Sequence, residues 1–507
     1  MDVVGYEFLR RRLNLSAFPL AHPARVAPVQ RIMHLPNDGV QVPRTVAPES
    51  DHPLDHVLFS LRHEGINLQV LAEAMPQIPA EDLMQRLRAT PSGLYIRQAC
   101  YLWESFTGRE LSDLPAVAGV YGSLFDPDRY VTGPTVRNPK WRISFNGLGS
   151  MDYCPTVRMT DAVGQGMESD ILGRTNAFLD SLGPINADRA LSWAYLSETD
   201  SSFAIERETP SPRKAEAFVA LLQQAHENVE LTEAYLSDLQ SSTISNPYDR
   251  AACFRHEQNW LRGGGLRGAS SVTYVPPAPD LLTSLMPAFM ALANSLSKQI
   301  NPIVAAAVES FGFVFLHPYM DGNGRLSRFL FHHALCQSGQ LERGLLLPVS
   351  IAMKRHEEQY LLALQSFSKP ARKLWDVTWI DEDQFAFDFK GQPSIYRYWD
   401  ATPCVEFGFR MAEEALNVDL RQETEFLASF DRISRAVNEE FDLRSNDQHL
   451  LIASALQNGG AISKNRRKQL VERVPGEAFE FIEALVKAEL AQQEAPSPSR
   501  PRSGPAL

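Results

Sequence analysis

Residues 317–328 have the sequence His-Pro-Tyr-Met-Asp-Gly-Asn-Gly-Arg-Leu-Ser-Arg, which collects several side chains suited to phosphate chemistry. His317 is the one group among them whose unperturbed pKa suits general-base work near neutral pH. Asp321 offers the hard carboxylate oxygens that magnesium prefers when it bridges phosphates. Arg325 and Arg328 share one face of a helix and could clamp distal phosphates. This pattern predicts a site that holds a nucleotide polyphosphate with a metal and attacks it.

Two glycines flank an asparagine in the middle of the motif. Gly322 and Gly324 remove side chains, so the backbone can approach phosphate oxygens and adopt positive φ. Asn323 can donate its amide to a phosphate oxygen and tolerates the left-handed region. Each feature alone also fits an ordinary turn or a solvated helix face. Together at this spacing they indicate a functional site.

Helices on both sides must position these residues. Apolar spacing predicts helices over about 278–298 and 302–316, and Pro318 should end the second one. A third helix should begin inside the motif and run through 329–335. The motif is then a loop entering a helix N-terminus, where free N–H groups and the helix dipole favour an anion.

The composition bounds the function classes. The chain has 507 residues and a formal net charge of −12, which argues against a nucleic-acid binder as a whole. The N-terminus lacks a basic segment followed by an apolar one, and no uncharged apolar run approaches the roughly 18 residues that span a bilayer. We therefore expect a cytoplasmic protein without a membrane partner.

The motif resembles the signature of the Fic family, which has the Fido fold: His-x-Phe-x-[Asp/Glu]-Gly-Asn-Gly-Arg-x-x-Arg. The one departure is Tyr319 in place of phenylalanine, at what should be a packing position. The resemblance extends through Glu257-Gln-Asn-Trp-Leu, Tyr274-Val-Pro-Pro and Ser350-Ile-Ala-Met-Lys-Arg-His. It covers about 200–370.

The resemblance implies a mainly α fold, a helical core with a small β-hairpin flap, flanked by largely helical N-terminal and C-terminal regions. It implies magnesium-dependent transfer of AMP from ATP to a Tyr, Thr or Ser hydroxyl of a target protein. By position, the implied roles are general base for His317, magnesium ligand for Asp321, α- and β-phosphate binding for Gly322, Asn323 and Gly324, and β- and γ-phosphate binding for Arg325 and Arg328. The Gly-Asn-Gly run favours this branch over the phosphorylating Doc branch.

The resemblance also implies a flap over about 267–275, where a glycine-rich turn leads into a short β segment. Ser271, Val272 and Thr273 would lie in the flap strand that pairs with the backbone of the target by strand addition.

Many Fic proteins carry an inhibitory helix with the pattern [Ser/Thr]-x-x-x-Glu-[Gly/Asn]. Ser60 to Gly65, with Glu64, fits these letters fully, whereas Ser202 and Glu206 are followed by arginine. We favour Ser202 and Glu206, because they lie inside the stretch that resembles the family core. A homodimer that stabilises this inhibited state is a further expectation.

We therefore predict that the chain consists of five regions. They are an irregular Pro-rich arm over 1–52, a helical and loop region over 53–196, the Fic catalytic domain with its inhibitory helix over 197–370, a C-terminal helical region over 371–490, and a disordered tail over 491–507.

Two alternatives stay open. The first keeps the site but changes the reaction, to removal of AMP or transfer from another nucleotide donor. The second is a regulator that binds DNA through 447–488, which loosely resembles a helix-turn-helix. Its basic residues Lys464, Arg466, Arg467 and Lys468 could meet phosphates, although a solvated helix face explains them more simply.

Overall fold

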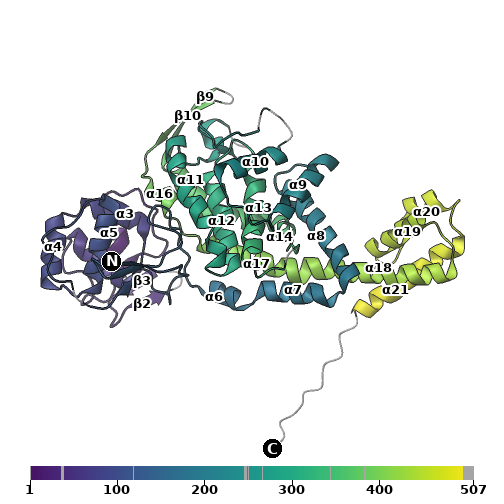
Figure 1. Cartoon of the computed structure of the whole chain (residues 1–507), viewed down its shortest axis with the longest axis horizontal. Helices are drawn as coiled ribbons and strands as arrows, with labels where there is room; N and C mark the ends of the chain where they lie inside the picture. The colour runs from purple at the N-terminus through teal and green to yellow at the C-terminus, as the bar shows by residue number, and fades with distance from the viewer. Residues whose placement is uncertain are drawn as a thin grey trace, which may run out of the picture. The chain divides into compact units, whose positions relative to one another are not determined.

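The computed structural model describes residues 2–35, 39–117, 119–244, 248, 250–264, 267–342, 344–381 and 384–494. This part is mostly helical, as Figure 1 shows. Its sheets are small, with two or three strands each. The mainly α fold is thereby confirmed. The predicted disordered tail over 491–507 is wrong for residues 491–494, which belong to the last helix, and its remaining residues lie outside the described ones. None of the described helices combines the length and apolar character needed to cross a membrane.

The chain divides into two compact units. One comprises Met1–Ala177 and Tyr195–Ala415, and the other comprises Phe178–Ala194 and Leu416–Leu507. This division differs from the five predicted ranges, because the predicted N-terminal region and catalytic domain share one unit. The long helix α8 (Pro184–Ile205) contributes residues to both units.

The N-terminal residues form a helix and a small sheet. The elements are α1 (Gly5–Arg12), β1 (Ala24–Val26), β2 (Met33–Leu35) and β3 (Gly39–Val42), with strand order β1-β3-β2. The prediction of an irregular arm over 1–52 is therefore wrong for these segments. The prolines, including Pro23, Pro28 and Pro43, fall between the elements, so they bound the strands without preventing them.

The rest of the N-terminal part is helical around a second small sheet. Its helices are α2 (Pro53–His63), α3 (Leu68–Ala74), α4 (Ala80–Ala89), α5 (Leu94–Thr107) and α6 (Asp161–Glu168). Its strands are β4 (Gly122–Ser123), β5 (Val136–Asn138) and β6 (Ile143–Phe145), in the order β4-β6-β5. Leu71, Trp103 and Trp141 are buried in the shared core.

The same unit continues with further helices, among them α12 (Pro302–Leu316) and α13 (Asn323–Gln337) on either side of the motif loop (Figure 1). The others are α9 (Pro212–Gln224), α10 (Glu233–Thr243), α11 (Pro279–Ala293), α14 (Val349–Arg355), α15 (Glu357–Arg372), α16 (Ser394–Arg397) and α17 (Thr402–Glu414). The side chain of Asn301 accepts the N–H groups of Ile303 and Val304, and Pro302 supplies the first helical position of α12. Nearly all of α12 is buried, and it packs along α13.

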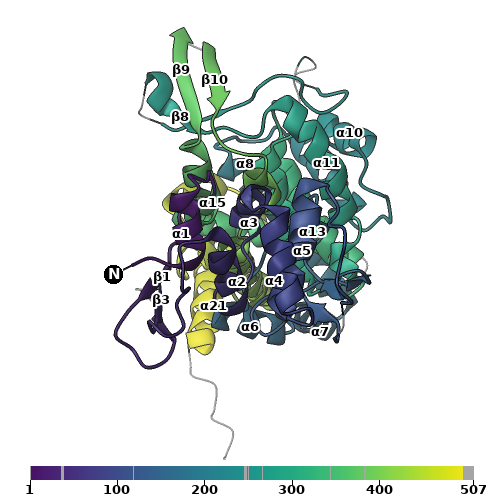
Figure 2. The same cartoon turned by 90° about the vertical axis from the view of Figure 1, so that its left-hand side faces the viewer.

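Two β-hairpins lie side by side at one end of this unit (Figure 2). The flap consists of β7 (Leu261–Arg262) and β8 (Val272–Tyr274), and the second hairpin of β9 (Trp375–Asp381) and β10 (Gln384–Phe389). The antiparallel register places Val377 opposite Phe387. These side chains share the face that packs on Trp260 and Val272 of the flap region.

The described part of the other unit is helical, and its second segment begins with most of a π-helix (Ala415–Leu420). Its α-helices follow along the chain. They are α18 (Arg421–Glu440), α19 (Ser445–Gln457), α20 (Lys464–Leu470) and α21 (Gly476–Glu494), while α7 (Ile171–Ser181) spans the boundary between the units. Ile433, Leu451 and Ile482 belong to its own apolar core. Arg467 forms an ion pair with Glu483, so one of the basic residues of 447–488 already has an acidic partner. Binding of DNA by this segment stays a prediction.

Candidate active site

His317 ends α12 in a left-handed conformation, with φ 51° and ψ 60°. This conformation is uncommon for a residue with a Cβ, and it turns the chain into the loop before α13. His317 Nδ1 lies 3.1 Å from the carbonyl oxygen of Val314. Because a carbonyl only accepts, Nδ1 carries the proton and the neutral ring keeps Nε2 as an acceptor. Burial lowers the pKa of His317 to about 4, so the ring is neutral around pH 7.

The loop after His317 is braced by its own residues. Tyr319 is buried as expected, and its hydroxyl lies 3.1 Å from Ser237 Oγ, which accommodates the oxygen that phenylalanine lacks. Asn323 Oδ1 accepts the Tyr319 N–H at 3.0 Å, and Asn323 Nδ2 donates to the Tyr319 carbonyl at 2.8 Å. The side-chain amide of Asn323 thus braces the loop, which differs from the phosphate contact expected for it.

The two glycines differ in conformation. Gly322 has the positive φ that was predicted, at 84°, and caps the N-terminus of α13. Gly324 lies within the first turn of α13 and does not have a positive φ, so its conformation was predicted wrongly. What Gly324 provides is space. A Cβ at this position would lie 2.3 Å from Oε1 of Glu206.

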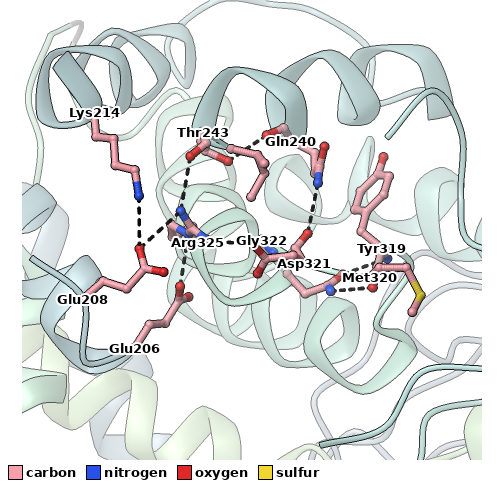
Figure 3. A network of polar contacts seen from close by, with 12 residues as sticks. Glu206, Glu208, Lys214, Gln240, Thr243, Tyr319, Met320, Asp321, Gly322 and Arg325 are labelled. Atoms are coloured by element: carbon pink, nitrogen blue, oxygen red, sulfur yellow. Dashed lines mark hydrogen bonds and ion pairs between the residues drawn. The ribbon is translucent and has the colours of Figure 1, made fainter. Parts of the chain in front are cut away.

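Arg325 is buried, with 2% of its side chain exposed, at the centre of a group of acidic residues (Figure 3). Its Nε lies 3.0 Å from Glu206 Oε2, its Nη1 3.8 Å from Glu208 Oε2 and its Nη2 3.6 Å from Asp321 Oδ2. Nη1 also donates to the Thr243 carbonyl at 3.2 Å. Within the described residues this buried Nε–H has an ion pair with Glu206 but no hydrogen bond.

Arg328, one turn further along α13, is equally buried. Its Nε donates to Ser202 Oγ at 2.6 Å, and its Nη2 donates to the Ser202 carbonyl at 2.9 Å and to Glu206 Oε1 at 2.6 Å. Glu206 therefore pairs with both motif arginines, one carboxylate oxygen to each. Its carboxylate lies against the first turn of α13, where the helix dipole favours an anion.

A row of polar residues four positions apart holds α8 against α13. Glu198 Oε1 lies 2.7 Å from His332 Nε2, and Glu198 Oε2 accepts the Ser350 N–H at 2.8 Å. Burial alone would raise the pKa of Glu198, but His332 and Ser350 hold it below its ordinary value. Glu198 and Ser202 thus share one face of α8, and Glu206 follows directly after the end of that helix.

Arg207 occupies the position where the family pattern has glycine or asparagine. It adopts the left-handed region with φ 61°. Glycine reaches this region without a steric penalty and asparagine reaches it more readily than most residues. The backbone turn after Glu206 is therefore kept despite the arginine, with some strain.

Asp321 presents a carboxylate to solvent beside the start of α13. Its side chain is 55% exposed, and its Oδ1 accepts the Gly322 N–H at 2.6 Å. The described part of the chain contains no cluster of three or more His, Cys, Asp or Glu side chains that could bind a metal. A single carboxylate beside an anion site suits Mg²⁺, which takes one or two carboxylates and completes its shell with phosphate and water oxygens. The residues present fit a magnesium ion that arrives with the nucleotide.

The flap residues have different exposures. Thr273 is exposed, whereas Ser271 and Val272 are buried, and Val272 packs in the apolar cluster under the second hairpin. The Val272 carbonyl accepts a hydrogen bond from Arg372 Nε at 2.9 Å. Contact of these three residues with a target stays a prediction.

Glu64, the other glutamate considered, lies in a different place. Its Oε1 accepts the N–H of Tyr6 at 2.9 Å and the hydroxyl of Ser60 at 2.7 Å, at the start of α1. The structure brings Glu206, and not Glu64, to the motif arginines.

Sequence reasoning missed two groups of residues. The first is Glu208, which faces Arg325 and pairs with Lys214 at 3.7 Å. Its position two residues after Glu206 could have indicated that it lies near the same arginine. The second group is Arg255 and Asn259, whose side chains donate hydrogen bonds to the loop. Nothing in the sequence indicated these contacts except that both residues lie in the segment that resembles the family.

Part of the chain is similar in sequence to known proteins. Residues 230–335 match the model of the Fic/DOC family. A protein adenylyltransferase Fic of Aedes aegypti is 36% identical over 108 residues, which are 21% of this chain and 20% of that protein. A protein adenylyltransferase Fic of Drosophila grimshawi is 36% identical over 88 residues, which are 17% of this chain and 17% of that protein. The chain thus aligns with about a fifth of these relatives' length.

Two solved structures are also similar. A Fic family protein of Desulfovibrio desulfuricans covers 65% of this chain and 89% of its own, with 20% identity and a TM-score of 0.37. A Fic domain containing signaling protein of Bacteroides thetaiotaomicron covers 49% and 96%, with 16% identity and a TM-score of 0.35. The family match covers the loop with His317 and the helix with both arginines. The chain therefore carries a domain of the Fic/DOC family at residues 230–335.

Proposed function

We propose that the chain is a protein adenylyltransferase that moves AMP from ATP to a hydroxyl of a target protein and is held inactive by Glu206. One observation carries this proposal: a neutral His317, whose Nε2 has no hydrogen-bond partner among the described residues, stands beside a loop whose two buried arginines are already paired with a carboxylate. The names of the curated relatives support the reaction class.

The transfer would use few protein groups. His317 Nε2 accepts the proton of the target hydroxyl as its oxygen attacks the α-phosphorus. The bond from that phosphorus to the β-phosphate oxygen breaks, pyrophosphate leaves, and the target keeps AMP as a phosphodiester. Arg325 and Arg328 hold the distal phosphates, and the N-terminus of α13 favours their charge. Asp321 would hold Mg²⁺, which neutralises phosphate charge when bound.

Glu206 would block this arrangement by occupying the anion site itself. Its carboxylate sits where Arg325, Arg328 and the first turn of α13 meet. A γ-phosphate there would be repelled by the carboxylate and would have to compete for both guanidinium groups. Glu208, 3.8 Å from Arg325, adds a second negative charge to the same place.

The test is intact-protein mass spectrometry of wild type, Glu206→Gly and Glu206→Gly/His317→Ala after incubation with Mg²⁺ and each nucleoside triphosphate in turn. We expect Glu206→Gly to gain the mass of AMP with ATP, because the protein's own hydroxyls serve as targets. Glu206→Gly/His22→Ala is the matched control, since His22 is an exposed histidine near the N-terminus, outside the motif.

A gain that survives the loss of His317 would contradict the assigned base. A gain only with another triphosphate would correct the donor. If no variant gains mass with any nucleotide, or only the wild type does, the proposed transfer with its Glu206 inhibition is wrong.

A further inference from the structure

Each backbone carbonyl from His317 to Asp321 accepts a hydrogen bond from a residue of the segment that precedes the flap or of α10. In loop order the donors are Arg255 Nε at 2.9 Å, the Arg255 N–H at 2.8 Å, Asn259 Nδ2 at 3.0 Å and again at 3.1 Å, and Gln240 Nε2 at 3.2 Å. The dashed line between Gln240 and Asp321 in Figure 3 marks the last of these. A surface loop normally leaves some carbonyls to water, so this complete set is notable.

Arg255 is an unusual donor, because its buried guanidinium binds backbone carbonyls in place of a carboxylate. Besides the His317 carbonyl, it donates to the carbonyls of Glu257 and Pro277. Within the described residues Arg255 forms no ion pair. Burial lowers its pKa to about 10, which agrees with a charge that lacks an anionic partner. A buried cation in such a setting is expensive, so a specific role for it is expected.

The direction of these carbonyls determines the direction of the loop's N–H groups. A trans peptide group places its C=O and N–H on opposite sides. The Tyr319 and Met320 carbonyls both accept from Asn259, and the Tyr319 carbonyl also accepts from Asn323. The N–H groups of Met320 and Asp321 therefore point away from Asn259. Neither N–H has a hydrogen-bond partner among the described residues. They remain available to an anion at the start of α13.

The same segment also holds the exit of the flap. Arg255 Nη2 donates to the Pro277 carbonyl, and Gln258 Nε2 donates to the Pro276 carbonyl at 3.0 Å. Pro276 and Pro277 follow β8 directly. Residues 255–259 therefore contact the loop that carries His317 on one side and the base of the flap on the other.

We propose that Asn259 and Arg255 are positioning residues with separate tasks. Asn259 orients the N–H groups of Met320 and Asp321 for nucleotide phosphates, and Arg255 fixes His317 relative to the flap that receives the target. This division of tasks rests on the proposed adenylyl transfer. Neither side chain touches the reacting atoms, so each acts through the backbone that it holds.

Asn259 is tested by nucleotide binding, which needs no turnover. In the Glu206→Gly protein, Asn259→Asp would put carboxylate oxygens against two carbonyls and turn the peptide groups. We expect calorimetry to give a Kd for magnesium ATP weaker by at least about tenfold. Asn259→Ala should show the same direction, which covers the case in which the aspartate variant does not fold.

The matched control is Asn294→Asp. Asn294 holds the Leu231 backbone with two hydrogen bonds, at 2.7 and 3.0 Å, and contacts no residue of the loop. It should bind ATP within about twofold of the parent. If Asn294→Asp weakens binding as much as the Asn259 variants do, or if those variants bind as the parent does, the role of Asn259 is wrong.

Arg255→Lys tests the other task, because lysine keeps the charge but cannot reach three carbonyls in a fixed plane. We expect the kcat of transfer to fall by at least about tenfold while the Kd for magnesium ATP stays within about twofold. Imidazole nitrogen shifts should show that His317 loses its single Nδ1–H tautomer, a readout that does not depend on transfer. An unchanged tautomer, or losses of kcat and affinity in parallel, would overturn this role. Absence of transfer in the Glu206→Gly parent would instead count against the proposed function.

Discussion

Two glutamates in this chain end a helix with the same pattern, Ser-x-x-x-Glu, yet they serve different surroundings. Glu64 is the C-cap of α2, and Glu206 follows α8 directly. The next residue has a positive φ in both cases, at 92° for Gly65 and 61° for Arg207. The local backbone pattern is therefore shared.

Both carboxylates also lie at the start of another helix. Glu64 accepts the N–H of Tyr6 in the first turn of α1, and Glu206 lies against Gly324 in the first turn of α13. The difference lies in the partners. Glu206 faces two buried guanidinium groups, whereas burial raises the pKa of Glu64 to about 7. The same letters thus make a helix cap in one place and an occupant of an anion site in the other.

The largest expected effect separates the two glutamates by activity. Glu206→Gly should raise His317-dependent auto-modification with labelled ATP by at least about tenfold, because it frees both arginines for phosphate. Glu64→Gly should leave the rate within about twofold of wild type. Activation by Glu64→Gly alone would reverse the assignment of the inhibitory residue.

The second prediction concerns stability without nucleotide. Glu206→Gln removes the carboxylate that the two buried arginines share and leaves Arg328 without an acidic partner among the described residues. The free energy of unfolding should therefore fall by about 3 kcal/mol, toward the low end for a broken buried pair. Chemical denaturation measures this change. Pyrophosphate should restore more stability to Glu206→Gln than to wild type, because it replaces the lost anion. Equal effects of pyrophosphate on both proteins would place the anion elsewhere.

The third prediction uses the pH dependence of Glu64. Its pKa is raised in the folded state from 4.5 to about 7, so the folded state binds the proton more tightly than the unfolded state does. Its contribution to stability is full below about pH 4.5 and is lost as the pH rises through 7. Glu64→Gln, which stays neutral, should remove a decline on the order of 2 kcal/mol between pH 5 and 8. Unfolding curves of both proteins across this range should diverge with pH, and parallel curves would contradict the shift.

The smallest effect concerns the residue after each glutamate. Arg207→Gly should stabilise the fold by up to about 1 kcal/mol and lower basal activity, because glycine relieves the left-handed strain next to Glu206. Gly65→Ala should destabilise it, since a Cβ there would lie 2.5 Å from the Tyr130 hydroxyl. Thermal unfolding and basal auto-modification check both. If Arg207→Gly is less stable than wild type, contacts of the arginine side chain stabilise the fold by more than the strained backbone at this residue destabilises it, and the prediction is wrong.

The helices around the site could be predicted from local signals. The apolar run after Pro302 and the break at Pro318 define α12, and the glycines define the turn into α13. The preference for Glu206 over Glu64 agrees with where the structure places the two carboxylates, since the first lies in the stretch that resembles the family.

Contacts between distant segments could not be predicted in the same way. The side-chain amide of Asn323 could bind a phosphate or hold the loop. It holds the loop because the Tyr319 backbone lies within hydrogen-bonding distance, which the sequence does not reveal. The β9–β10 hairpin lies in the range 371–490 that was predicted to be helical, so that prediction is wrong for this segment. The hairpin was missed because its stability depends on burial against Trp260 and Val272, more than 100 residues earlier. The strands near the N-terminus were missed because prolines between elements resemble prolines in irregular chain.

Calorimetric titration of wild type and Glu206→Gln with magnesium and a non-hydrolysable ATP analogue tests the central claim most directly. The claim is that the Glu206 carboxylate occupies the place of a nucleotide phosphate, between Arg325 and Arg328. The account predicts that Glu206→Gln binds the analogue at least about tenfold more tightly than wild type, because a competing anion has been removed. Equal affinities, or weaker binding by Glu206→Gln, would contradict it.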